Sequence, residues 1–194
     1  MPKALLAYYL AFLVLGFVWP SLRIWFRQRI NPFVLSFKDD AHGVVSKSFS
    51  LVTIGLLCAL IAALRCPPEA FGPLIWAESA TLRMAGWTFL GTSSLAMFVA
   101  QAQMGRAWRI GFDQGARPEL MTGGLFSRSR NPIFLSMRVN LIGLFLVWPN
   151  AVTLAALLLG EVMLQAQVRM EETYLSEKLG DEYATYLRQT PRWL

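Results

Sequence analysis

Four long apolar blocks constrain the fold of this chain more than any other feature of its sequence. They cover residues 4–19, 48–64, 84–102 and 132–166, and each contains few charged side chains. A helix needs about 20 apolar residues to cross the hydrocarbon core of a bilayer, which is roughly 30 Å thick. The first three blocks each fit one crossing, and the fourth is long enough for two.

The composition also indicates a membrane protein. Hydrophobic residues make up 55% of the chain and charged residues 15%, against roughly 25% charged in an ordinary soluble domain. Inside lipid, each backbone polar group must be paired within its own segment, and the blocks lack the alternation of barrel strands. We therefore predict an all-α, polytopic membrane protein with about five transmembrane helices, forming a single domain over residues 1–194.

A turn signal divides the fourth block into a helical hairpin. Trp148-Pro149-Asn150 is a strong helix breaker and separates predicted helices at about 132–148 and 151–169. Antiparallel packing would bring Arg138 and Glu161 to the same depth in the membrane. Because charges at that depth are costly, they are usually paired or functional. Either the two residues form a salt bridge that locks the hairpin, or Arg138 binds an anionic group of a substrate.

The distribution of basic residues predicts the orientation. The link 66–79 contains Glu69 and Glu78 and neither Lys nor Arg. Basic residues instead follow the first and third blocks, at Arg23, Arg27, Arg29, Lys38 and Lys47, and then at Arg106, Arg109, Arg117, Arg128 and Arg130. Loops rich in Lys and Arg stay in the cytoplasm. We expect the N-terminus outside and both basic loops and the C-terminus in the cytoplasm; the inverted orientation is the alternative.

The remaining composition excludes several classes of function. The net charge of +6 comes from residues beside the predicted helix ends, so the expected partner is the bilayer and not a nucleic acid. Cys58 and Cys66 provide neither a disulfide framework nor a metal-binding spacing. His42 is the single histidine. We therefore predict no metal site.

Residues 120–132 form the first stretch suited to binding. Gly123 and Gly124 permit a tight backbone and close approach of a ligand. Arg128 and Arg130 follow, and Pro132 suits the first position of the next helix. The N-terminus of such a helix offers free N–H groups to an anion. By itself, the stretch also fits an ordinary basic cytoplasmic loop.

The second such stretch begins where the last apolar helix would leave the membrane. It contains adjacent carboxylates, Glu171 and Glu172, which could hold a cation or the hydroxyls of a ribose. The alternative is a solvated amphipathic helix in the cytoplasm. Its apolar face would follow the helical period and would consist of Leu175, Leu179, Tyr183 and Tyr186.

Together, the two stretches resemble a known family. The chain reads Thr122-x-Gly124-x-Phe126-Ser127-x-x-Arg130-x-Pro132, then the hairpin, then Arg169-x-Glu171-Glu172-x-x-Leu175 and Gly180-x-Glu182-Tyr183-x-x-Tyr186. This pattern resembles the isoprenylcysteine carboxyl methyltransferases and, more distantly, the membrane phospholipid N-methyltransferases. The resemblance implies S-adenosylmethionine as methyl donor and a lipophilic acceptor that arrives from the bilayer. It also implies a cofactor-binding and catalytic half at 101–194, beside scaffold helices at 1–100.

The resemblance also implies roles for particular residues. Arg169 and Glu172 are expected to be catalytic, and Arg169 to contact the acceptor. Arg138 is a further candidate for the acceptor, from its depth in the membrane and not from the resemblance. The implied cofactor-binding residues are Gly124, Arg130, Asn131, Pro132, Phe134, Glu171, Glu172 and Tyr183. The eukaryotic enzymes have His and Tyr at the positions of Asn131 and Phe134. The contacts of that His and Tyr therefore cannot be carried over unchanged.

The chemistry of methyl transfer favours one acceptor. A carboxylate is already a nucleophile at neutral pH and needs only a positioning cation such as Arg169. An amine needs a base, for which Glu171 and Glu172 are the nearby candidates. We therefore expect methylation of a lipid-linked, isoprenylcysteine-like carboxylate, with a phospholipid or amine N-methyltransferase as the alternative. Two other classes are a nicotinamide-dependent membrane reductase and a non-enzymatic scaffold.

Overall fold

The computed structural model describes residues 1–28, 33–34, 41–105, 110–111 and 118–194. Its main helices are α1 (Pro2–Leu13), the π-helical turn η1 (Val14–Val18), α2 (Trp19–Gln28), α3 (Ala41–Ala62), α4 (Ala80–Met104), α5 (Pro132–Val147), α6 (Ala151–Leu179) and α7 (Asp181–Gln189). Short 3-10 turns are η2 (Pro68–Phe71), η3 (Ile75–Ala77) and η5 (Gly124–Ser127). The two-residue strands β1 (Phe33–Val34) and β2 (Ile110–Gly111) pair in parallel. The prediction of a helical fold is confirmed.

Three of the described helices are long and apolar enough to cross a membrane. They are the continuous helix Pro2–Phe26, then His42–Ala62, and finally Ala151–Leu179. The helix α4 has 25 residues, but its threonines, serines and glutamines lower its mean hydropathy. The helix α5 is strongly apolar but has only 16 residues. The membrane character is therefore shown, and the count of five spans stays a prediction.

The hairpin between α5 and α6 confirms the predicted turn. Asn150 caps α6, because its side-chain oxygen accepts hydrogen bonds from the N–H groups of Val152 (2.9 Å) and Thr153 (3.1 Å). The first helix ends at Val147, within a residue of the prediction. The second helix is longer than predicted and continues ten residues past Arg169, to Leu179. Glu171 and Glu172 therefore lie within α6, two turns before its end.

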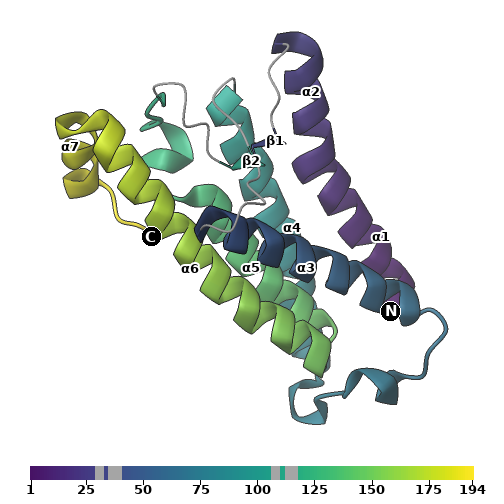
Figure 1. The fold of residues 1–194 in the computed structure, drawn as a ribbon. Coiled ribbons are helices and arrows are strands. Elements are labelled where there is room, and N and C mark those ends of the chain that lie inside the picture. The colour runs from purple at the N-terminus through teal and green to yellow at the C-terminus, as the bar shows by residue number, and fades with distance from the viewer. Residues whose placement is uncertain (29–32, 35–40, 106–109, 112–117) are drawn as a thin grey trace.

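The connections lie at two opposite ends of the bundle (Figure 1). At one end, the link between α3 and α4 bonds to the hairpin turn: the N–H of Leu74 donates to the carbonyl of Pro149 (3.1 Å), and the N–H of Ala151 donates to the carbonyl of Gly72 (2.9 Å). At the other end lie α7 and the C-terminus. The basic residues Arg29, Lys38, Arg106, Arg109 and Arg117 fall outside the described residues.

The helices α4 and α5 pack closely because glycines meet at their interface. A Cβ atom at Gly86 would lie 2.9 Å from the backbone nitrogen of Val147 and 3.0 Å from the carbonyl oxygen of Gly143. One at Gly143 would in turn lie 3.0 Å from the carbonyl oxygen of Gly86. Small residues allow such close backbone approach between membrane helices.

A polar network joins α1 to this pair of helices. The hydroxyl of Tyr8 in α1 lies 2.8 Å from that of Ser94 and donates to the carbonyl of Leu90 (3.1 Å), both in α4. The side-chain amide of Asn140 in α5 donates to Tyr8 and to Ser93 (3.2 Å). Asn140 is 3% exposed, so these contacts satisfy polar groups that lipid could not.

Gly180 separates α6 from α7. Its φ of 54° is in the left-handed region, which glycine adopts readily and other residues rarely do. The predicted single amphipathic helix is thus two helices with a sharp turn between them. The predicted apolar positions still gather in one cluster, which comprises Leu179, Tyr183 and Tyr186 with the partly buried Leu120, Leu175 and Leu187. The turn brings the C-terminal tail, Thr190–Leu194, back towards the start of α5.

Candidate functional site

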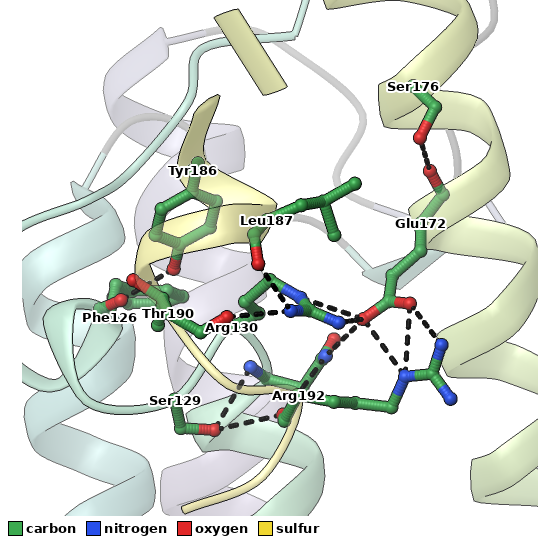
Figure 2. A network of polar contacts seen from close by, with 10 residues as sticks. Phe126, Ser129, Arg130, Glu172, Ser176, Tyr186, Leu187, Thr190 and Arg192 are labelled. Carbon is green, nitrogen blue, oxygen red and sulfur yellow. Dashed lines mark hydrogen bonds and ion pairs between the residues drawn. The ribbon is translucent and has the colours of Figure 1, made fainter. Parts of the chain in front are cut away.

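Two arginines from distant segments share the carboxylate of Glu172 (Figure 2). Arg130, just before α5, donates from Nε (3.1 Å) and Nη2 (3.0 Å) to Oε1. Arg192, in the C-terminal tail, donates from Nη2 (2.6 Å) and Nε (3.0 Å) to Oε2. The side chain of Glu172 is only 10% exposed. The directly paired groups therefore carry one more positive than negative charge.

Further hydrogen bonds fasten the tail to the start of α5. The N–H of Arg130 donates to the carbonyl of Pro191 (2.9 Å), and its Nη1 donates to the carbonyl of Thr190 (2.6 Å). The hydroxyl of Ser129 donates to the carbonyl of Arg192 (3.2 Å). The side-chain amide of Asn131 donates to Glu172 Oε1 (3.2 Å). The stretch that precedes Pro132 thus holds both Glu172 and the tail in place.

The glycine-containing turn η5 borders this network. Gly124 has a φ of 63°, and a Cβ there would lie 2.5 Å from the amide carbon of Gln103 in α4. The N–H of Leu125 donates to that amide (2.9 Å). The hydroxyl of Tyr186 donates to the carbonyl of Phe126 (2.5 Å). These contacts fix η5 between α4 and α7, so local packing explains why position 124 is a glycine.

Two buried tyrosines and Arg192 keep their protons in this environment. Burial, followed by the negative charge of Glu172, raises the pKa of Tyr183 well above its ordinary value. Burial raises the pKa of Tyr186 to about 12. The hydrogen bond to Glu172 raises the pKa of the Arg192 guanidinium. The tyrosines therefore serve as neutral hydroxyls at physiological pH, and Arg192 stays charged.

The predicted pair of Arg138 and Glu161 is present. Arg138 Nε donates to Glu161 Oε2 over 2.7 Å, and the two side chains are 28% and 35% exposed. Gln165 donates to the other oxygen of Glu161 (2.8 Å). The tail reaches this pair as well, because the Arg138 guanidinium lies over the ring of Trp193, 4.5 Å from its centre. The salt-bridge interpretation is confirmed.

Other polar side chains on α6 extend the site along the helix. Glu161, Gln165, Arg169 and Glu172 recur at spacings of four, four and three residues, which places them on one face. We call these four residues the polar stripe of α6. Arg169 is exposed and Glu171, beside the stripe, is half buried. Neither makes a hydrogen bond or ion pair within the described part of the chain.

The structure thus brings together only part of the predicted set. Arg130, Asn131 and Glu172 are in direct contact, and Pro132 is the buried first residue of α5. Tyr183, 1% exposed, lies in the hydrophobic cluster with Leu179 and Tyr186. Among the described residues, Phe134 and Gly124 make no polar contact with Glu172, Arg130 or Arg192.

Sequence reasoning missed the part played by Arg192. It lies 20 residues from Glu172 along the chain, and nothing in its local pattern distinguishes it from other basic residues near helix ends. The available signal was Gly180, which marks a helix end that could turn the tail back.

The fold and the site together define a helical membrane protein with a buried ion-pair cluster at one end of its bundle. The family model of the phospholipid methyltransferases matches residues 81–182, more than half of the chain. The chain therefore belongs to this family of membrane methyltransferases. The match covers α4, α5 and α6 and stops before the tail. Comparison with curated proteins and with solved structures gives no match.

Proposed function

We propose that this protein transfers a methyl group from S-adenosylmethionine to a lipophilic acceptor in the membrane. The observation that carries the proposal is the cluster around Glu172. Within the family segment, it joins the start of α5 to α6 through Arg130 and Asn131. S-adenosylmethionine, when bound, supplies a methyl group on a positively charged sulfur, and its loss to a nucleophile leaves a neutral thioether.

The side chains around the cluster fit such a cofactor. Arg130 and Arg192 share the single carboxylate of Glu172, so the cluster carries an excess positive charge that suits an anionic group. Glu171, half buried and without a hydrogen-bond partner within the described residues, suits an ammonium group or ribose hydroxyls. Asn131 can both donate and accept. Together, these side chains complement the carboxylate, the ammonium group and the ribose hydroxyls of S-adenosylmethionine. None of these contacts requires a metal ion.

We propose that the acceptor group is a carboxylate on a lipid-linked molecule. A carboxylate needs no proton removed before it acts as a nucleophile, so a positioning cation is sufficient. Arg169 supports this role because it is an exposed cation on the polar stripe with no protein partner among the described residues. Arg138 is already paired with Glu161, another residue of the polar stripe. An apolar tail would enter from the lipid side while its head group lies along the stripe.

The second candidate acceptor is the amine of a phospholipid, in keeping with the name of the family. An ammonium must first lose a proton to a base. Glu172 is a poor base because Arg130, Asn131 and Arg192 all donate to it. Glu171 makes no such bond with the described residues, so it is the better candidate to accept the proton.

Isotopic labelling separates these acceptors. Purified protein in nanodiscs is incubated with S-adenosylmethionine labelled in the methyl group and with a lipid extract of its host. We expect label in the lipid fraction; alkali should release it as volatile methanol from a methyl ester but not from a methylated amine. Arg169→Gln should slow transfer to a carboxylate, and Glu171→Gln should slow transfer to an amine. Protein that transfers no label, and that binds a nicotinamide cofactor instead, would indicate a reductase.

The proposed orientation places the cofactor site in the cytoplasm, where S-adenosylmethionine is made. Ser176, near the end of α6, and Glu69, in η2, are both exposed. The end of α6 and the link between α3 and α4, which contains η2, lie at opposite ends of the bundle (Figure 1). In a background without Cys58 and Cys66, a cysteine at position 176 should resist an impermeant thiol reagent in intact cells. A cysteine at position 69 should react at once. The reverse pattern of labelling would contradict the orientation.

A further inference from the structure

The two arginines that hold Glu172 differ in how many guanidinium donors they leave available for a ligand. In Arg130, all three guanidinium nitrogens donate to the protein: Nε and Nη2 to Glu172, and Nη1 to the carbonyls of Thr190 (2.6 Å) and Leu187 (3.4 Å). The side chain is 10% exposed. Four of the five guanidinium N–H groups of Arg130 therefore donate within the chain, and the buried side chain has little capacity to bind anything else.

Arg192 is also held by Glu172, but it uses fewer of its donors within the described residues. Its Nε and Nη2 donate to Glu172, whereas Nη1 makes no hydrogen bond with a described residue. Figure 2 shows this third nitrogen pointing away from the carboxylate. The side chain is 38% exposed. A fixed, charged donor is thus presented beside a carboxylate that a second arginine already neutralises.

From this geometry we infer that Arg192 is the residue that binds the anionic group of the ligand. The cluster has an excess positive charge, and an incoming carboxylate or phosphate would balance it. Because Glu172 fixes the guanidinium in advance, little side-chain entropy is lost on binding. The inference rests on the proposed function and adds a residue outside the segment 81–182 that matches the family.

Two ligands could supply the anion, namely the carboxylate of S-adenosylmethionine and the phosphate of a lipid. The first arm of the test measures binding of S-adenosylmethionine and of its decarboxylated analogue by calorimetry. If the carboxylate is the partner, Arg192→Gln should weaken binding of S-adenosylmethionine roughly ten- to hundredfold, since a hydrogen bond to a charged group is lost. Binding of the decarboxylated analogue should be unchanged.

The second arm titrates short-chain phosphatidic acid into the same proteins in detergent. A loss of affinity here, with S-adenosylmethionine binding unaffected, would assign Arg192 to a lipid phosphate. Affinities of Arg192→Gln within twofold of wild type for both probes would overturn the inference. If the wild-type protein binds no S-adenosylmethionine, the proposed function fails, and the phosphatidic acid titration alone decides the role of Arg192.

Controls separate binding from folding, because Arg192 also fastens the tail. Arg188→Gln removes an equal charge from an exposed position on α7, where Arg188 bonds only Thr185 among the described residues. It should bind both probes like wild type. Arg192→Lys keeps the charge and should recover part of the lost affinity. If Arg192→Gln unfolds at a lower temperature than wild type, the affinity of Arg192→Lys is compared instead, provided that its Tm matches wild type. Wild-type affinity in Arg192→Lys would then show that binding does not need the guanidinium that Glu172 holds in place.

Discussion

Glu172→Gln should lower the free energy of unfolding by about 3–5 kcal/mol, the usual cost of breaking a buried ion pair from one side. A neutral amide cannot satisfy Arg130 and Arg192 together, and the side chain at this position is 10% exposed. The tail should detach from the start of α5 as a result. Thermal unfolding followed by tryptophan fluorescence measures the loss, and hydrogen exchange at 190–193 measures the release of the tail.

The neighbouring residue provides a matched control. Glu171→Gln makes the same chemical change one position away, where the carboxylate has no hydrogen bond or ion pair with the described residues. Because no ion pair is broken there, the loss of stability should be much smaller than in Glu172→Gln. Equal losses in the two variants would show that Glu172 does not hold the cluster together.

Removing one member of the pair between Arg138 and Glu161 should cost about 2.5–3.5 kcal/mol, the penalty for a lone charge within a membrane helix. Their 2.7 Å contact lies between α5 and α6, well away from the hairpin turn. Arg138→Leu and Glu161→Leu should each lower Tm, and the double variant should recover most of the loss because no charge remains. Additive losses would contradict mutual pairing.

Activity of the double variant tests whether Arg138 also contacts the acceptor. If the pair only locks the hairpin, the double variant should fold and transfer methyl groups at nearly the wild-type rate. If Arg138 also contacts the acceptor, the variant should fold normally but show a raised KM for the lipid. Trp193, which covers the Arg138 guanidinium, offers a fluorescence signal for lipid arriving there.

The hairpin was predictable because its signals are local. A breaker at 148–150 and two ionisable residues at matching distances from it are sufficient to predict the turn, the antiparallel packing and the ion pair. The number of spans was less predictable. In α4, polar residues such as Ser93, Ser94 and Gln101 are buried against other helices, so hydropathy alone underestimates how well that helix is accommodated.

Only those parts of the candidate site that lie in a short sequence motif were predictable. Arg130 and Glu172 were found because each lies in a recognisable motif. Their direct contact depends on the packing of α5 on α6, and the addition of Arg192 depends on the turn at Gly180. Neither is encoded in a short pattern. The resemblance implies that Arg130 binds the cofactor, and this stays a prediction. In the structure, its guanidinium nitrogens donate to Glu172 and to the tail.

The contact of Tyr8 with α4 and α5 bears on how the chain is assembled during synthesis. Membrane helices insert first and associate afterwards, and Tyr8 is separated along the chain by 86 residues from Ser94 and by 132 from Asn140. The first helix therefore enters the bilayer carrying a hydroxyl whose partners have not yet been translated. Its final position is set late, once α5 has been made. The N-terminal helices therefore do not reach their final packing before the rest of the chain is made. They are synthesised first, but the polar contacts of Tyr8 form only with the segment that carries the methyltransferase motifs.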